Sequence, residues 1–364
     1  MPMEITRIDA QQRAAVIYGP GQLRVESRPV LMPHPGEALV AIRTVGICGS
    51  DLGYLRGSSK YPVETPFVLG HEAAGVVAAL GDPLEGRADH GIPVGTRVAL
   101  VPGSSCGHCA QCRAGRDNLC SGVRYLGSAA TNPPVDGALQ SYLCLPVEQL
   151  LPIPDDVSYA TAALLEPLGV AEHAVRRAEV ADRSVLITGG GAIGQLLALV
   201  ARSAGALEVT VCEVQERRRR LALDHGATSV VTPAEIDKRI MHEDRFDVVF
   251  DATGNVAAVE LCIRAAKPGT GRVVVVGNLP SGTGFSPELV ARAEIWLSAT
   301  FRFPGGLERA LSLITGGLDV EWLVESTAGI ERVGEVLAVS ELGDPPIKIQ
   351  FTSNHAERWR MSAD

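Results

Sequence analysis

Residues 184–301 alternate short apolar strands with helices, and this alternation constrains the fold more than any other feature of the chain. An Ala- and Leu-rich helix is predicted at Ile193–Ser203, directly after the first strand. Runs rich in Val, Ile and Leu predict strands at 184–188, 208–213, 229–231, 247–253, 272–277 and 295–301. Strands that alternate with helices form a parallel sheet with helices on both faces. A doubly wound α/β domain is therefore predicted.

The first 150 residues follow a different pattern. Apolar runs at 38–45, 75–80 and 97–101 are separated by Gly- and Pro-containing turns, which is typical of a β-barrel or sandwich. The chain of 364 residues is long for one core and suits two domains. The pattern changes near residue 158, and a closing strand is predicted at 346–351, before a polar tail.

The turn after strand 184–188 reads GGGAIG and matches the motif G-x-G-x-x-G. Its glycines permit a tight turn, close approach of a pyrophosphate and close packing of helix against strand. The N-terminus of the following helix presents free N–H groups to phosphates. The sequence therefore predicts a dinucleotide site, with contacts from Gly189, Gly191, Ile193 and Gly194.

Glu213 ends the second strand of this unit. A carboxylate at this place accepts hydrogen bonds from ribose hydroxyls and repels a 2′-phosphate. NAD is therefore favoured over NADP. Arg217 and Arg218 follow closely and leave NADP open, because an arginine there can accommodate the phosphate; Arg218 is included among the predicted cofactor contacts.

Four cysteines, Cys106, Cys109, Cys112 and Cys120, follow the spacing C-x2-C-x2-C-x7-C. Four thiolates brought this close suit a tetrahedral zinc ion, and a shell closed by four sulfurs leaves no reactive position. The pattern predicts a structural zinc site. A disulfide pair is the alternative.

Charge and hydropathy limit the partners of the chain. The net charge of −9 argues against a nucleic-acid surface, which needs a basic footprint. No segment reaches the roughly 20 apolar residues that span a membrane. The first 13 residues carry acids and no apolar stretch, and four of the eight cysteines have metal-ligand spacing. A cytoplasmic protein with no membrane partner is expected.

A second set of metal-binding residue types lies in the β-rich half. Cys48 belongs to the segment CGSD (48–51), and His71 and Glu72 belong to GHE (70–72). Together they supply sulfur, imidazole and carboxylate, three ligand types of an open catalytic zinc site.

With these motifs the chain resembles the zinc-dependent medium-chain alcohol/polyol dehydrogenase family. The matching pieces are CGSD (48–51), GHEAAGVVAALG (70–81), CGHCAQCRAGRDNLC (106–120) and the glycine-rich turn, in the family's order. The resemblance covers nearly the whole chain. It implies a GroES-like zinc-binding catalytic domain at 1–157, completed by 302–364, and a Rossmann NAD-binding domain at 158–301.

The resemblance also implies the ligands and the reaction. Simple alcohol dehydrogenases have a cysteine about where this chain has Glu166-Pro167-Leu168, which is similar to sorbitol, threonine and related polyol dehydrogenases. In that subgroup Cys48, His71 and Glu72 would hold zinc, and Glu166 would either ligate it or bind its water. Two zinc ions per subunit are expected. Zinc would lower the pKa of a substrate hydroxyl, and hydride would pass from the carbinol carbon to the nicotinamide.

Further residues receive roles through the same resemblance. Ser50 would pass the alcohol proton outward. The family often has a histidine where this chain has Gly53, so a relay through that histidine is absent or replaced by water. Tyr54 would line the substrate pocket, although a core tyrosine is an equal alternative. Segment 301–303 resembles the place where polyol dehydrogenases meet nicotinamide and substrate, which gives Phe301 a cofactor role and Arg302 a substrate role. The end of strand 272–277 adds predicted cofactor contacts from Val276, Gly277 and Asn278.

The substrate is inferred from resemblance alone. Segment 124–137 (RYLGSAATNPPVDG) looks most like L-idonate 5-dehydrogenases, which favours a sugar acid, and Arg302 suits a carboxylate. The alternatives are a neutral polyol such as sorbitol or xylitol, and L-threonine. A zinc-free quinone reductase and a non-catalytic zinc protein are the competing classes. A homotetramer is expected, assembled through edge strands near 295–301.

Overall fold

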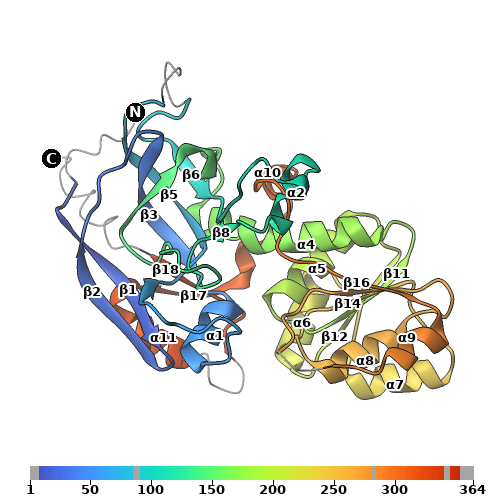
Figure 1. Cartoon of the computed structure of the whole chain (residues 1–364). Coiled ribbons are helices and arrows are strands. Elements are labelled where there is room, and N and C mark those ends of the chain that lie inside the picture. The colour runs from blue at the N-terminus through green and yellow to red at the C-terminus, as the bar shows by residue number, and fades with distance from the viewer. Residues whose placement is uncertain (1–7, 85–90, 281–283, 340–344, 353–364) are drawn as a thin grey trace. The chain divides into compact units, whose positions relative to one another are not determined.

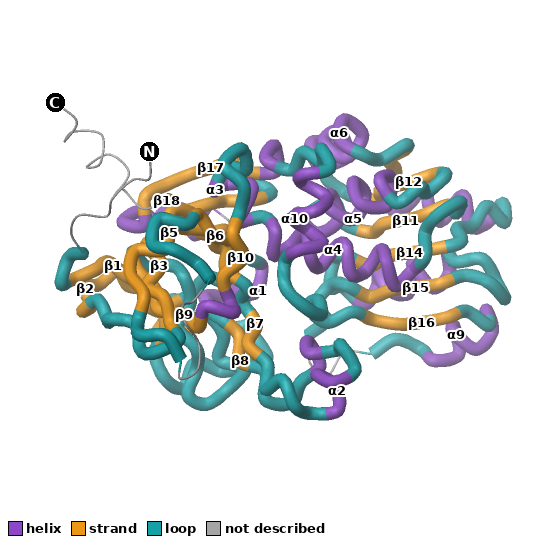
Figure 2. Tube along the Cα trace, turned by 90° about the horizontal axis from the view of Figure 1, so that it is seen from above, coloured by secondary structure: helices purple, strands orange, loops and turns teal. Residues whose placement is uncertain are grey.

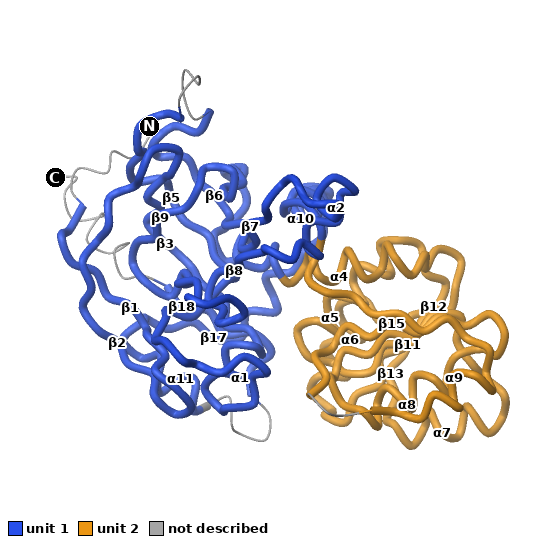
Figure 3. Tube along the Cα trace, viewed as in Figure 1, with its two compact units in different colours: residues 1–166, 304–364 blue, residues 167–303 orange. Residues whose placement is uncertain are grey.

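The computed structural model describes residues 8–84, 91–280, 284–339 and 345–352 and divides into two compact units (Figures 1 and 3). Unit 1 comprises Met1–Glu166 and Pro304–Asp364, and unit 2 comprises Pro167–Phe303. Residues 1–7 of the acidic N-terminal stretch and the predicted polar tail at 353–364 lie outside the described residues.

Unit 1 is built on two sheets and a short hairpin. The smaller sheet has the order β2 (Gln22–Pro29), β1 (Gln11–Gly19), β4 (Phe67–Val68). The larger sheet has the order β10 (Leu150–Pro152), β6 (Arg97–Leu100), β5 (Glu72–Leu80), β3 (Glu37–Gly46), β18 (Lys348–Thr352), β17 (Val324–Gly329), and β9 (Tyr142–Pro146) also pairs with β3. The hairpin joins β7 (Gly103–Ser104) to β8 (Arg124–Tyr125).

Strand β3 organises this unit because it pairs with three other strands, β5, β9 and β18. Its run of small and branched apolar side chains is buried on both faces, as a central strand requires. The pairing with β18 is antiparallel and sets Phe351 opposite Val45. The C-terminal segment thus completes the sheet that the N-terminal half begins.

Short helices connect these strands. They are α1 (Gly49–Arg56), α2 (Ala110–Arg113), α3 (Tyr159–Ala163), α10 (Glu308–Thr315) and α11 (Val333–Val339), with 3-10 turns at Asp117–Leu119, Val147–Gln149, Glu321–Leu323 and Ile330–Arg332. Helix α1 begins directly after β3 with a capping box, in which the Asp51 carboxylate accepts the Cys48 N–H at 2.9 Å. It ends at Gly57, whose φ of 71° is the left-handed conformation that glycine adopts without strain.

Unit 2 contains the predicted doubly wound sheet. Its parallel strands have the order β13 (Ser229–Val231), β12 (Glu208–Cys212), β11 (Ser184–Thr188), β14 (Val248–Asp251), β15 (Arg272–Val275), β16 (Trp296–Ala299). Figure 2 shows β12, β11, β14, β15 and β16 side by side. The order reverses between β11 and β14, and open α/β sheets bind ligands at such a switch point.

Helices cover both faces of this sheet. They are α5 (Ala192–Ser203), α6 (Glu216–His225), α7 (Pro233–Met241), α8 (Val256–Ala265) and α9 (Pro287–Ala293), together with α4 (Leu165–Ala178), which begins at the end of unit 1. Helix α8 packs against α7 and α9, and Figure 1 shows these three on one side of the strands with α4 on the other. Strands β14, β15 and β16 end earlier than predicted, because the residues beyond them turn into loops.

The boundary between the units falls at 166/167, nine residues after the predicted boundary at 157/158. Helix α3 causes this difference, because it packs on β3, β5 and β6 of unit 1. In the described part of the chain, none of the helices has the length and apolar character that crossing a membrane requires.

Candidate active site and metal centres

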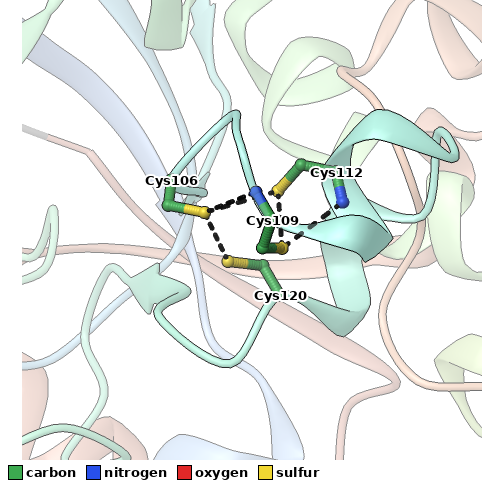
Figure 4. A group of neighbouring side chains, drawn as sticks. All are labelled: Cys106, Cys109, Cys112 and Cys120. Carbon is green, nitrogen blue, oxygen red and sulfur yellow. Dashed lines mark hydrogen bonds between the residues drawn. The ribbon is translucent and has the colours of Figure 1, made fainter.

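The four cysteines of segment 106–120 converge in unit 1 (Figure 4). The Sγ atoms of Cys106 and Cys120 are 3.5 Å apart, those of Cys109 and Cys112 are 3.5 Å apart, and those of Cys106 and Cys112 are 3.9 Å apart. Zinc with Zn–S bonds of about 2.3 Å would separate tetrahedral sulfurs by about 3.8 Å. The cluster therefore has the size of a zinc thiolate site, and all four cysteines are free of disulfides.

Backbone N–H groups prepare these sulfurs to act as thiolates. The N–H groups of His108 and Cys109 lower the pKa of the Cys106 thiol to about 6, with Cys109 N donating at 3.4 Å. Cys112 N donates in the same way to Cys109 Sγ at 3.5 Å, and this bond lowers the pKa of Cys109. A hydrogen bond from Ser105 lowers the pKa of Cys112, but burial and the neighbouring thiols raise it more, to about 11. A dication at the centre of the cluster would favour the thiolate form of each cysteine, because metal binding displaces the thiol protons.

The second donor set forms where β3 and β5 run side by side. Cys48 is the N-cap of α1, just beyond β3, while His71 and Glu72 lie at the start of β5. Glu72 is paired with Gly46 in the sheet, so the ends of the two strands bring sulfur, imidazole and carboxylate within 4.8 Å of one another. Gly46 is needed here, because a Cβ on it would lie 2.3 Å from Glu72 Oε2.

The Asp51 carboxylate contacts the residues of this donor set. Its carboxylate is fully buried, accepts the N–H groups of Cys48 and Gly70 at 2.9 and 3.3 Å, and lies 3.8 Å from His71 Nδ1. Burial raises the pKa of Asp51. Burial lowers the pKa of His71, but the charges of Asp51 and Cys48 raise it more, to well above its ordinary value.

These observations fit a metal ion. His71 offers an imidazole nitrogen beside the Cys48 thiol and the Glu72 carboxylate, and the Asp51 carboxylate faces its Nδ1 atom at 3.8 Å. A nearby thiol, carboxylate and imidazole would together satisfy a divalent cation, and a carboxylate beside a metal-binding histidine is the usual means of orienting the ring.

Lys348 is a buried partner of Glu72 that the sequence analysis missed. Its ammonium donates to Glu72 Oε1 and Oε2 at 2.8 and 2.7 Å and to the Ile47 carbonyl at 3.1 Å. Burial lowers the pKa of Lys348, while the negative charge of Glu72 raises it more, so its net pKa lies above the ordinary value. The only sequence signal was a lysine inside the apolar run PIKIQF.

Glu166 lies near this donor set without belonging to the group of three. It is buried at the first turn of α4, where it interacts electrostatically with His71 and Glu72. Burial raises its pKa more than His71 and the hydrogen bond from Tyr125 lower it. The Tyr125 hydroxyl donates to Glu166 Oε1 at 2.7 Å. Tyr125 was noted only as part of segment 124–137, and this bond could not be inferred from the sequence.

Ser50 and Tyr54 occupy different environments on α1. Ser50 is half-buried in the first turn, two residues after Cys48. Tyr54 is buried in the core of unit 1, where its ring packs edge-on against Phe67 and its hydroxyl accepts the Ala129 N–H at 2.9 Å. This environment corresponds to the alternative of a core tyrosine.

In unit 2 the glycine-rich turn lies between β11 and α5, at the switch point of the sheet. Gly189 has a φ of 94°, and a Cβ on Gly194 would lie 1.8 Å from the Gly189 carbonyl oxygen, so both positions require glycine. A Cβ on Gly191, the N-cap of α5, would meet no atom within 4 Å. Ile193 lies in the first turn of α5. The open side of the turn at Gly191 is where a phosphate can approach the helix N-terminus.

Glu213 is tied to this turn. Its Oε2 accepts the Gly190 N–H at 2.7 Å and its Oε1 accepts the Gln215 N–H at 2.9 Å. These bonds hold the carboxylate at the end of β12, beside the glycines. Arg218 lies on α6 nearby, and its carbonyl accepts a hydrogen bond from Gln195 at 3.0 Å.

The loops after β14 and β15 close against each other at the same edge. Asp251 is fully buried and accepts the N–H groups of Thr253 and Gly254, while its carbonyl accepts those of Val276 and Gly277. A Cβ on Gly277 would lie 2.2 Å from Gly254 N, and a Cβ on Gly254 would lie 2.5 Å from the Asn278 carbonyl oxygen. Residues 276–278 follow β15, and the glycine-rich turn follows β11. Both segments therefore lie at the carboxyl ends of the parallel strands.

Phe301 and Arg302 follow β16. Phe301 is 39% exposed, and the Arg302 guanidinium lies 4.7 Å above its ring. Arg302 has a φ of 53°, a conformation that is strained for residues other than glycine. Strain of this kind gathers at functional positions, so the segment remains a candidate site.

Comparisons with known proteins agree with this architecture. Residues 34–155 match the model of the alcohol dehydrogenase GroES-like domain, and residues 192–315 match that of zinc-binding dehydrogenases. Both predicted domain types are thereby confirmed. The sorbitol dehydrogenase of Bacillus subtilis is 33% identical over 341 residues, which cover 91% of this chain and 94% of that protein.

Two solved structures share the fold over nearly their whole length. The L-idonate 5-dehydrogenase of Escherichia coli superposes with a TM-score of 0.87 at 29% identity, covering 94% of this chain and 98% of the other. A putative zinc-binding dehydrogenase from Sinorhizobium meliloti, solved with NADP, superposes with a TM-score of 0.84 at 30% identity, covering 94% and 100%.

Proposed function

The chain belongs to the zinc-dependent medium-chain alcohol/polyol dehydrogenase family, and from this we propose that it oxidises a secondary alcohol of a sugar acid of the L-idonate type with NAD. The observation that carries the proposal is the convergence of Cys48, His71 and Glu72 within 4.8 Å in a chain that also forms the glycine-rich turn. One unit supplies the donor set and the other supplies the dinucleotide turn.

The proposed roles follow from the local structure of each residue. When bound at Cys48, His71 and Glu72, zinc supplies Lewis acidity that favours loss of a proton from a substrate hydroxyl. Asp51 orients the His71 ring, and Ser50, half-buried in the first turn of α1, carries the released proton outward. Glu166, buried near this donor set, would bind the metal's water or the substrate hydroxyl. A second zinc at the four cysteines holds the 106–120 lobe together.

We propose NAD as the preferred cofactor because Glu213 presents a carboxylate beside the glycine-rich turn. NADP remains the competing cofactor, since Arg218 lies on the next helix and a relative of 30% identity was solved with NADP. Glu213→Ala should weaken binding of NADH about tenfold and reduce the discrimination against NADPH. Nicotinamide fluorescence titrations measure the affinities for NADH and NADPH. Glu216→Gln is the matched control, because it removes an exposed carboxylate that pairs with Arg220 on α6.

The sugar-acid assignment rests on segment 124–137 and Arg302 and is supported by similarity to an L-idonate 5-dehydrogenase. A neutral polyol is the second candidate, and similarity to a sorbitol dehydrogenase favours it. We assign Arg302 to a substrate carboxylate, because its fork of donors suits a planar anion.

The test is reduction of NAD or NADP, followed by absorbance, with L-idonate, D-gluconate, sorbitol, xylitol and L-threonine in parallel. A preference for L-idonate that Arg302→Gln abolishes would support the sugar-acid proposal. Turnover of sorbitol or xylitol alone would establish the polyol alternative. Turnover in Cys48→Ser equal to that of the wild type would refute the catalytic zinc assignment.

The proposed holoenzyme is a cytoplasmic homotetramer that carries two zinc ions per chain. The exposed edge strand β16, with Trp296 73% exposed, supports assembly through the 295–301 segment. Light scattering of the wild type and of Trp296→Arg tests the assembly, and metal analysis tests the zinc content.

A further inference from the structure

Tyr125 and Glu166 form a buried hydrogen bond beside the proposed catalytic metal site. The two side chains belong to residues that are 8% and 6% exposed, and the hydroxyl-to-carboxylate distance is 2.7 Å. A hydrogen bond to a carboxylate is stronger than one between neutral groups, and burial strengthens it further. One of the two Glu166 oxygens is therefore committed to Tyr125.

The position of the tyrosine is fixed from two sides. Tyr125 lies on β8, where it pairs with Gly103, and a Cβ on Gly103 would lie 3.4 Å from the ring. The ring also stands 5.7 Å from the His71 imidazole, measured between ring centroids. These contacts with Gly103 and His71 restrict movement of the Tyr125 ring, so the tyrosine cannot easily follow a displaced Glu166 carboxylate.

The carboxylate that Tyr125 holds is close to the metal ligands but outside their group. Glu166 interacts electrostatically with His71, Glu72 and Lys348. Among the described residues, the donor atoms that lie within 4.8 Å of one another at this site nevertheless come from Cys48, His71 and Glu72 alone. A fourth protein ligand would close the site, whereas a catalytic zinc needs one position for water or substrate.

We propose that Tyr125 is a positioning residue: its hydroxyl holds the Glu166 carboxylate out of the metal's coordination shell and so keeps one position open. This inference rests on the proposed function, because it assumes a catalytic metal at Cys48. It assigns Glu166 to the metal's water or to the substrate hydroxyl rather than to the metal itself.

Tyr125→Phe removes only the hydroxyl and leaves the ring packed against Gly103. The freed carboxylate should then join the metal. We expect zinc to leave the catalytic site of the purified holoenzyme about tenfold more slowly, and kcat to fall about tenfold with little change in the KM for NAD. Release into a chelating dye gives the first quantity, and Cys48→Ser shows which phase of release belongs to the catalytic site.

Two further variants separate this role from a merely structural one. Tyr18→Phe breaks a part-buried tyrosine–glutamate bond of similar length, from the Tyr18 hydroxyl to Glu26 at 2.8 Å, in the same unit, and should leave zinc release and turnover unchanged. In a Glu166→Ala background, Tyr125→Phe should have no further effect on zinc release, because the group it restrains is gone.

Faster or unchanged zinc release from Tyr125→Phe would overturn the inference, and so would an equal effect of Tyr125→Phe with and without Glu166. A different set of results would show that the proposed function itself is wrong. In that case the wild type would hold only the zinc of the four cysteines, and Cys48→Ser would change neither metal content nor turnover.

Discussion

The Lys348 ammonium lies 2.8 and 2.7 Å from the two carboxylate oxygens of Glu72, and both side chains are buried. The strands that carry them are neighbours of β3 on opposite sides, so the pair forms across the strand that leads to Cys48. The C-terminal strand thereby neutralises one carboxylate of the candidate metal site. Removing one partner of such a pair leaves an uncompensated buried charge.

Lys348→Met should therefore lower the free energy of unfolding by about 3 kcal/mol. Urea unfolding of the purified protein measures the loss, and Lys348→Met combined with Glu72→Gln should recover part of it. Lys267→Met is the matched control, because Lys267 pairs with Asp247 at 2.7 Å but is 43% exposed. The control should lose less than about 1 kcal/mol. Equal losses of unfolding free energy in Lys348→Met and Lys267→Met would mean that burial does not make the Lys348–Glu72 pair more costly to break.

Cys48→Ser and Cys112→Ser should fail in different ways. Cys48→Ser should lose turnover and one zinc ion per chain with the same thermal unfolding midpoint, since Cys48 is half-buried and lies outside β3 as the N-cap of α1. Cys112→Ser should lose the other zinc and unfold at a lower temperature, because it opens a closed shell. Metal analysis and calorimetry provide the two readouts. Cys144→Ser, outside both sets, should change neither.

Two glycines of the dinucleotide turn should separate packing from ligand approach. Gly194→Ala places a Cβ 1.8 Å from the Gly189 carbonyl oxygen and should destabilise unit 2 and abolish NADH binding. Gly191→Ala meets no atom within 4 Å, so stability should be preserved while NADH binding weakens about tenfold through contact with the phosphates. Unfolding curves and fluorescence titrations test this contrast, which would fail if both variants bound NADH normally.

Asp247 should contribute to the acid limit of stability. Burial raises its pKa, but hydrogen bonds from Lys267 and Ser184 lower it more, so the folded-state pKa lies below the unfolded one. The unfolded state then binds more protons, and stability rises with pH across this window. The contribution is present above about pH 4 and is lost as the pH falls through the lowered pKa. Urea unfolding of wild type and Asp247→Asn should therefore converge in acid and differ most near neutral pH.

The sequence by itself determined the two-domain architecture. The alternation of strands and helices after residue 184 led directly to the parallel sheet, because side-chain periodicity and glycine turns are local properties of the chain. The spacing of Cys106–Cys120 is local in the same sense, and the structure brings those four sulfurs together. The pairing of Cys48 with His71 and Glu72 was inferred from residue type and resemblance, and β3 and β5 bring these side chains together.

Only the tertiary structure decided which groups surround the candidate metal. Lys348 is 276 positions from Glu72, and Tyr125 is 41 positions from Glu166, so no periodicity connects them. The environment of Tyr54 was equally undetermined, because an aromatic side chain at the same helical position can face a pocket or a core. These contacts depend on how β18 pairs with β3, how β8 pairs with β7 and how α1 packs against β1. Local propensities do not encode such packing, because it arises from burial summed over the whole unit.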